Sequence, residues 1–151
     1  MCIRDRHGID LDADPDVLTQ YFSGRHFKAQ LKRGSVYELP YESNFFDLEV
    51  SFSVFEHLQE YERALREVHR VLKPNGLFLL GMPSVNKVME AGFFAIGYKG
   101  INDLHITKPE DVASHFETVG FKCIGKGMLD FPLPSPLGLR LYHNWLLQKP
   151  A

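Results

Sequence analysis

Cysteine is scarce in this sequence, which has only Cys2 and Cys123 among its 151 residues. Two cysteines so far apart form neither a disulfide framework nor a cysteine-rich metal site. Structural disulfides belong to oxidising compartments, so this cysteine usage favours a reducing one. We therefore predict a cytoplasmic location.

Long apolar runs and clusters of basic residues are also missing. The longest apolar run, residues 77–82, is far shorter than the about 20 residues that a membrane-spanning helix needs. No apolar segment typical of a secretory signal follows the charged N-terminus. The net charge is −2, and no run of Lys or Arg offers a surface for nucleic acid or membrane. These absences favour a small-molecule partner and leave the oligomeric state open.

The apolar content is sufficient for one folded domain. The chain is 44% hydrophobic with 12 Phe, and its length is that of a single domain. The first six residues, MCIRDR, alternate charge with little apolar content and lead abruptly into HGIDLDAD. We predict that residues 1–6 are a non-native or disordered leader and that residues 7–151 form a single, partial domain.

Short apolar segments alternate with amphipathic ones from Gly8 onward, which is the pattern of a βαβ sheet. Strands are expected near residues 8–9, 27–31, 45–52, 77–83, after residue 120, and over residues 139–148. Helices are expected after the Asp14 N-cap, over residues 60–73, and near residues 109–119. For the last of these helices, Thr107 and Glu110 predict a capping box. The basic residues near the end of the second helix are expected to face its dipole: Arg66, Arg70 and Lys73.

Asp10 ends the first expected strand. In open α/β sheets, ligands bind beyond the carboxyl ends of the strands. An acidic group there can accept hydrogen bonds from both ribose hydroxyls of a nucleoside. An aspartate after a strand is also a common helix cap or solvated turn, so Asp10 alone leaves both roles open.

The order of four segments narrows the class of protein. They are GIDLDAD, GSVYELPYESNFFDLEVSFSVFEHL, LREVHRVLKPNGLFLLGMPS and HITKPEDVASHFETVGFK. This succession resembles class I S-adenosylmethionine-dependent methyltransferases, particularly the broad, type 11-like subgroup that methylates small molecules. The resemblance covers roughly residues 8–125. It implies a Rossmann-like doubly wound α/β sheet, mostly parallel with an antiparallel C-terminal strand.

The resemblance also implies S-adenosylmethionine as the cofactor. Asp10 would hold the ribose, and Leu11 would pack on the adenine. The aspartate that the family has in its next loop is Ser35 here, a neutral and shorter group, and Val36 follows it. This departure leaves adenine selectivity in question. The segment that would line the methionine part of the cofactor consists of Ser51, Phe52 and Ser53.

Glu56 and His57 match the family's E-H pair and would face the reaction centre. Methyl transfer from a sulfonium requires mainly alignment of nucleophile, methyl and sulfur. For a hydroxyl acceptor a base that exchanges protons near neutral pH helps, which makes His57 the candidate. The alternative is that the pair only caps and orients the following helix. No two histidines have metal-ligand spacing with a cysteine or carboxylate, so we predict no metal.

His105 and Phe93 are the candidates on the acceptor side. His105 precedes a helix start, where the family often has a histidine, and a structural role is equally open. Phe93 belongs to an aromatic stretch with Phe94 and Tyr98, which would form either a lid over an apolar acceptor or a helix packed on the sheet. His69 is expected on the solvated face of its helix.

The family's glycine-rich loop and the strand before it have no counterpart in this sequence, since both would precede Asp10. We expect the two strands that would flank the absent strand to lack a partner on that edge. This chain should therefore fold marginally and bind cofactor poorly or not at all. The predicted function is S-adenosylmethionine-dependent methyl transfer to a small-molecule acceptor, by an enzyme of which this chain is a fragment. The alternatives are a non-catalytic methyltransferase-like scaffold and, without a catalytic Tyr/Lys pair to support it, a nicotinamide-dependent oxidoreductase.

Overall fold

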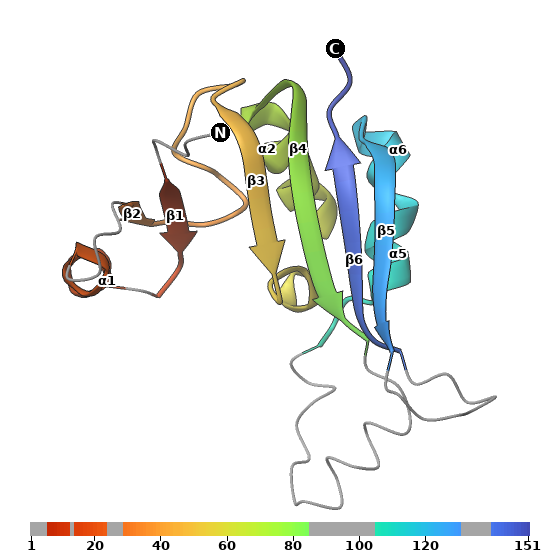
Figure 1. Cartoon of the computed structure of the whole chain (residues 1–151), viewed down its shortest axis with the longest axis horizontal. Coiled ribbons are helices and arrows are strands. Elements are labelled where there is room, and N and C mark those ends of the chain that lie inside the picture. The colour runs from red at the N-terminus through yellow and green to blue at the C-terminus, as the bar shows by residue number, and fades with distance from the viewer. Residues whose placement is uncertain (1–5, 13, 24–28, 85–104, 131–139) are drawn as a thin grey trace, which may run out of the picture. The chain divides into compact units, whose positions relative to one another are not determined.

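The computed structural model describes residues 6–12, 14–23, 29–84, 105–130 and 140–151, whose helices and strands Figure 1 labels. The chain forms two compact units, residues 1–41 and residues 42–151. Most of the predicted leader and the aromatic stretch around Phe93 lie outside the described residues. The single-domain organisation stays a prediction.

Unit 1, residues 1–41, is a small βαβ unit. Its elements are β1 (His7–Asp10), α1 (Pro15–Ser23) and β2 (Gln30–Arg33). The two strands are parallel, with Ile9 opposite Lys32. Helix α1 begins as predicted, because Asp14 Oδ1 accepts the backbone N–H of Asp16 at 2.9 Å. Strand β2 lies slightly later in the chain than expected.

Unit 2, residues 42–151, is built around a four-stranded sheet. Its strands are β3 (Phe46–Phe52), β4 (Leu72–Pro83), β5 (Lys122–Asp130) and β6 (Arg140–Gln148), in the order β3-β4-β6-β5. Strands β3 and β4 are parallel, whereas β6 is antiparallel to both β4 and β5. Three strands therefore run in one direction and the C-terminal strand runs against them, which confirms the predicted pattern.

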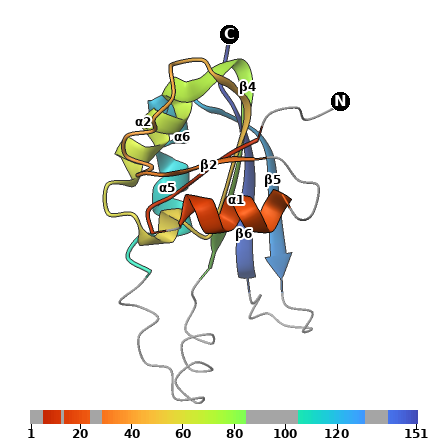
Figure 2. The ribbon, with the colours of Figure 1, turned by 90° about the vertical axis from the view of Figure 1, so that its left-hand side faces the viewer.

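One face of this sheet is covered by α2 (Tyr61–Val71), α5 (Pro109–Ser114) and α6 (Phe116–Val119), as Figure 1 and Figure 2 show together. The apolar residues of α2 repeat at helical spacing and are buried: Ala64, Leu65, Val68 and Val71. They pack on alternate residues of the sheet, because side chains of a strand point to opposite faces in turn. The buried sheet residues on this side are Phe78, Leu80, Met82, Trp145 and Leu147. In the part of the chain that is described, no helix has the length and apolar character to cross a membrane.

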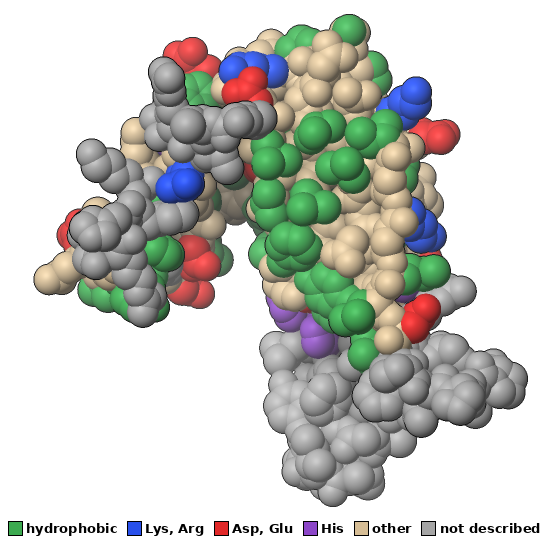
Figure 3. Space-filling view, in the orientation of Figure 1, with side chains coloured by type: hydrophobic (Ala, Val, Ile, Leu, Met, Phe, Trp, Pro, Cys, Tyr) green, Lys and Arg blue, Asp and Glu red, His purple; other side chains and the backbone are tan. Residues whose placement is uncertain are grey.

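The other face of the unit 2 sheet carries exposed apolar side chains, which Figure 3 shows in green. Leu48, Val50 and Phe52 alternate along β3 and are 43%, 51% and 47% exposed. Leu129 on β5 is 59% exposed. This sheet therefore has one well-packed face and one apolar face open to water.

The C-terminal end of α2 is held by a lysine that follows β6. Lys149 Nζ donates to the carbonyl oxygens of His69 and Leu72 at 2.9 and 2.8 Å. It also donates to Asn44 Oδ1 at 2.8 Å, and burial lowers the pKa of its ammonium group. Arg70 lies in the last turn of α2, as expected. The three basic residues expected near this end of the helix also pair with carboxylates: Arg66 with Glu62, Arg70 with Glu67, and Lys73 with Asp47.

The turn between α2 and the straight part of β4 is left-handed at Asn75, whose φ is 63°. Asparagine tolerates this conformation better than most residues do. Helix α2 ends at Val71, slightly earlier than predicted. The pairing of β4 with β3 is irregular between Phe46 and Leu48.

The predicted capping box between Thr107 and Glu110 is wrong. Among the described residues, no side chain caps α5, whose N-cap is Lys108. The Thr107 hydroxyl donates to the Leu58 carbonyl at 2.6 Å and is therefore engaged elsewhere. The expected single helix also breaks at His115, where the imidazole contacts the Asp111 carbonyl oxygen at 2.9 Å. Such local side-chain contacts compete with the helical ladder.

Candidate functional site

Asp10 lies exposed at the carboxyl end of β1, where the sequence predicts it. Its Oδ1 accepts the backbone N–H of Asp12 at 2.9 Å, which forms a local turn. Its backbone carbonyl accepts the N–H of Gly34 at 3.0 Å. Arg33 Nε donates to the Leu11 carbonyl at 2.8 Å and fixes the residue after the aspartate. The strand-end position is therefore formed within unit 1 itself.

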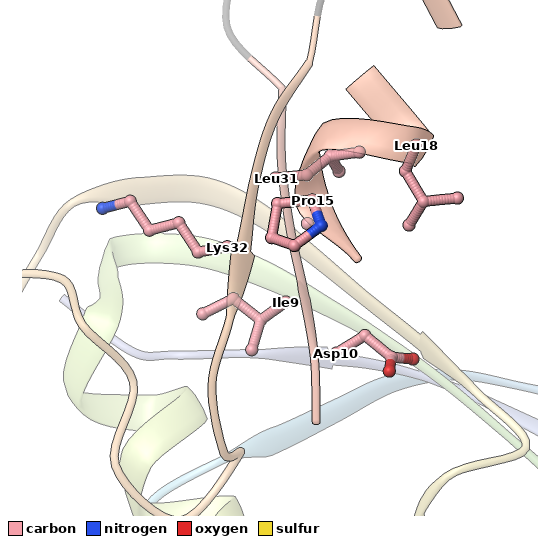
Figure 4. Close-up of a pocket in the computed structure, with 7 residues that line it drawn as sticks. Ile9, Asp10, Pro15, Leu18, Leu31 and Lys32 are labelled. Atoms are coloured by element: carbon pink, nitrogen blue, oxygen red, sulfur yellow. The ribbon is translucent and has the colours of Figure 1, made fainter. Parts of the chain in front are cut away.

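A hollow of about 160 Å³ lies beside Asp10 in unit 1. Pockets for drug-sized ligands measure about 300–1,000 Å³, so the hollow alone does not enclose a nucleoside. Figure 4 shows the Asp10 carboxylate and the Lys32 ammonium group pointing to opposite sides. The remaining lining residues are mostly apolar: Gly8, Ile9, Pro15, Leu18 and Leu31.

The predicted adenine contacts are also in unit 1. Leu11 is 62% exposed next to Asp10. Ser35 and Val36 are half-buried in the loop after β2, where Ser35 Oγ accepts the N–H of Tyr37 at 3.2 Å. An accessible carboxylate suits ribose hydroxyls, and an exposed leucine suits the flat face of a base. The chemistry of these residues therefore fits an adenosine group.

The backbone turns sharply at the carboxyl end of β3. Ser53 has a φ of 54°, in the left-handed region, which costs about 1–2 kcal/mol for a residue with a Cβ. Its hydroxyl lies 3.0 Å from Tyr142 Oη, and its N–H donates to the Gly81 carbonyl at 3.1 Å. Ser51 is half-buried near the end of β3. Strained backbone of this kind concentrates at functional sites.

Gly81 makes room for the aromatic rings at this end of the sheet. A Cβ there would overlap the Phe52 ring and lie 2.7 Å from Tyr142 Cε1. The two rings lie against each other with their centroids 6.4 Å apart. Neither Gly81 nor Tyr142 is a site residue by sequence pattern, because their proximity depends on strand pairing.

Glu56 and His57 lie in a 3-10 turn, η1 (Phe55–His57), just after β3. Glu56 is 1% exposed, and burial raises the pKa of its carboxyl group, an effect that a backbone hydrogen bond and the neighbouring His57 and His105 reduce. Glu56 Oε1 lies 3.7 Å from His57 Nε2. The His57 imidazole is exposed, so the pair combines a buried carboxyl group with an accessible ring.

His105 joins this pair from a distant part of the sequence. Its ring stacks on that of His57, with centroids 5.1 Å apart and planes at 26°. The next two residues, Ile106 and Thr107, donate their N–H groups to the Glu56 carbonyl at 2.9 and 3.1 Å. The structure thus brings together three predicted site residues, which spacing along the chain could not show.

Two further expectations concern single residues. His69 is not simply solvated: its ring lies against Phe121, with centroids 5.0 Å apart, and burial lowers the pKa of its imidazole. Packing of the α6–β5 corner against α2 brings this about. Phe93 lies outside the described residues, so its acceptor-side role stays a prediction.

The fold resembles that of solved proteins with a Rossmann-like methyltransferase fold. An S-adenosylmethionine-dependent methyltransferase from Methanosarcina mazei has a TM-score of 0.73 at 17% identity, with 97% of this chain and 82% of that chain covered. The [4+2]-cyclase SpnF has a TM-score of 0.74 at 17% identity, with 96% and 66% covered. At such identities the likeness establishes the fold alone.

A family model described as a methyltransferase domain matches residues 4–80, about half of the chain. The chain therefore belongs to this family of methyltransferase domains. This membership confirms the predicted family and fold class.

Two curated relatives show how much of the chain and of each relative the sequence similarity covers. A probable S-adenosylmethionine-dependent methyltransferase of Mycolicibacterium smegmatis is 33% identical over 79 residues, which is 52% of this chain and 30% of that protein. An uncharacterised protein, MJ0638, of Methanocaldococcus jannaschii is 28% identical over 134 residues, 87% of this chain and 53% of that protein. The chain thus spans about a third to a half of the length of these relatives. The cofactor in the name of the first is the one that the sequence predicts.

Proposed function

We propose that this chain belongs to an enzyme that transfers a methyl group from S-adenosylmethionine to a small-molecule acceptor. The observation that supports this most directly is the exposed Asp10 carboxylate at the end of β1, with the exposed Leu11 beside it, in a chain of the methyltransferase-domain family. We also propose a cytoplasmic location, with which the exposed Cys123 thiol agrees.

The cofactor contacts in this proposal follow the residue chemistry. The Asp10 carboxylate accepts the ribose hydroxyls, while Leu11 and Val36 offer apolar surface to the adenine and Ser35 a hydroxyl to its amine. When bound, the cofactor supplies a methyl group activated by the positive sulfonium. The residues proposed to line its methionine part are those at the end of β3: Ser51, Phe52 and Ser53.

On the acceptor side, His57 is the proposed proton acceptor and Glu56 its partner. An imidazole that takes up a proton becomes a cation, which the adjacent carboxyl group of Glu56 stabilises when it is ionised. His105 and Phe93 are proposed to contact the acceptor. Positioning supplies most of the rate in such a transfer, and proton removal assists only acceptors that must lose one.

A non-catalytic methyltransferase-like scaffold is the second candidate. One observation favours it: among the described strands, β1 pairs with β2 alone and β3 with β4 alone, so that two sheets form instead of one. The [4+2]-cyclase with the same fold also illustrates that this architecture does not define the reaction. No observation favours the nicotinamide-dependent oxidoreductase.

We expect this chain to bind S-adenosylhomocysteine more weakly than micromolar, with the contacts confined to the predicted residues. Titration followed by two-dimensional amide NMR detects binding with a Kd in the millimolar range, which is too weak for calorimetry to measure well. The resonances of Asp10, Leu11 and Val36 should shift, and the response should disappear in Asp10→Asn.

The matched control is Asp12→Asn, which changes a neighbouring carboxylate but leaves Asp10 in place. Micromolar binding by calorimetry would contradict the expected weakness. A response that Asp10→Asn leaves unchanged would remove the proposed ribose contact, and with it the main support for the function.

A further inference from the structure

Three side chains that can bind a metal ion converge just beyond the carboxyl end of β3. Glu56, His57 and His105 each offer one ligand atom, and these atoms all lie within 4.8 Å of one another. Figure 3 shows histidine side chains at this end of unit 2. Metal–ligand bonds of about 2.0–2.2 Å require the atoms to come somewhat closer. Because His57 is the exposed member, rotation of its side chain can supply that movement.

The Glu56 carboxyl group provides a second, independent observation. The residue is 1% exposed, and within the described part of the chain its Oε2 has no hydrogen-bond partner. A buried polar atom without a partner costs free energy, so native proteins rarely retain one without a role. A cation bound by the Glu56 carboxylate and the two histidines would balance the charge of this buried group.

The backbone holds the third ligand in place without any ion. Ile106 and Thr107 donate their N–H groups to the carbonyl of Glu56, and the Thr107 hydroxyl donates to the carbonyl of Leu58 at 2.6 Å. Three hydrogen bonds therefore attach the segment that follows His105 to the η1 turn. Such fixed backbone reduces the entropy that ligand binding must overcome.

We propose that Glu56, His57 and His105 bind one divalent transition-metal ion, with zinc as the best fit. Two imidazoles and one carboxylate form a donor set that zinc sites use, and three protein ligands leave a position for water or another oxygen ligand. Magnesium and calcium prefer oxygen ligands and fit less well. The sequence predicts no metal, because the ligands come from segments far apart in the chain.

This cation site does not depend on the proposed methyl transfer. A scaffold without methyltransferase activity would bind the ion equally well. When the ion is bound, His57 is one of its ligands, so the proton-accepting role proposed for His57 belongs to the metal-free chain.

The test is calorimetric titration of the tag-free 151-residue chain with zinc chloride. We expect about one equivalent to bind with micromolar affinity or tighter. His105→Ala and His57→Gln should each weaken binding at least about tenfold, as expected when one of three ligands is lost. Zinc should also raise the melting temperature of the parent chain but of neither variant.

The matched control is His115→Gln. This histidine lies 3.1 Å from Glu62 on the surface and outside the cluster, so its loss should leave zinc binding unchanged. Because His57 is exposed, its substitution should preserve the fold even if His105→Ala does not, and circular dichroism checks both. Zinc affinity unchanged in His57→Gln, or lowered equally in His115→Gln, would overturn the proposal; tighter binding of magnesium would overturn the choice of zinc.

Discussion

At the scale of single residues, Glu49 is a carboxyl group in a strongly perturbed environment. It points to the helix-covered side of β3, where burial, together with the nearby Glu67 carboxylate, raises its pKa to about 8. Within the described residues its Oε2 has no hydrogen-bond partner. Ionised Glu49 is therefore destabilising to the folded state.

The pKa of Glu49 predicts that the chain loses stability as the pH rises. Between its usual value of 4.5 and about 8, the folded state keeps a proton that the unfolded state has released. The free energy of unfolding must then fall with increasing pH over this range. In Glu49→Gln the fall should be much smaller, so that the variant is the more stable protein at alkaline pH.

Urea denaturation of both proteins at several pH values measures this effect. Glu117→Gln, which removes an exposed carboxylate on α6, is the control and should follow the parent chain. Parallel stability curves for Glu49→Gln and the parent would contradict the prediction.

The positions of single site residues were predictable where an acidic residue or a histidine lies at or just after the end of a strand. Asp10 and Glu56–His57 stand directly after apolar segments, and the structure places them there. The convergence of His105 on Glu56 was not predictable, because it depends on hydrogen bonds between segments far apart in the chain. The room that Gly81 provides for Phe52 and Tyr142 likewise appears only when three strands are paired.

At the scale of elements, the link between Lys149 and α2 is an unusual helix end. The lysine that follows β6 donates to two carbonyls at the helix C-terminus and to Asn44. We predict that Lys149→Met destabilises unit 2 by about 1–3 kcal/mol, since it removes charged hydrogen bonds while keeping the apolar stem. Amide hydrogen exchange should accelerate mainly in the last turn of α2.

Lys122→Met is the matched control, because Lys122 is an exposed lysine on β5. It should change the urea midpoint little. Equal effects of the two substitutions would show that loss of positive charge, and not the helix end, determines the stability.

The elements themselves were predictable to different degrees. The buried stripe of α2 and the alternation on β3 follow directly from residue periodicity. The predicted capping box was wrong because the Thr107 hydroxyl donates a hydrogen bond to the Leu58 carbonyl. No local sequence pattern contains such a tertiary contact. Of the basic residues expected near the end of α2, Arg70 lies in its last turn, whereas Lys73 lies in β4 because the helix ends at Val71.

At the scale of the whole molecule, the open face of the unit 2 sheet dominates the expected behaviour. Contiguous exposed apolar side chains favour self-association. We predict that the chain binds the dye ANS and associates as its concentration rises, and that Val50→Thr reduces both effects while keeping a β-branched side chain. Fluorescence and sedimentation velocity provide the measurements.

Val17→Thr is the control, because Val17 is 62% exposed on α1 and outside this face. It should alter dye binding less than Val50→Thr does. If the two variants behave alike, the open sheet face is not the surface responsible.

The mostly parallel sheet with one antiparallel strand and the family were predictable from the sequence, because they depend on the order of elements. The division into two units was not predictable from the sequence, since it depends on which strands pair with each other. In the described residues, β1 pairs only with β2, and β3 pairs only with β4.

The position of β6 has a consequence for biosynthesis. This strand is made after β5, yet it lies between β4 and β5 and pairs with both. A nascent chain on the ribosome can pair β3 with β4, but β5 must wait without a partner until residues 140–148 have left the exit tunnel. The sheet of unit 2 therefore closes only after β6 has emerged, and until then β4 and β5 expose edges that chaperones or other nascent chains can bind.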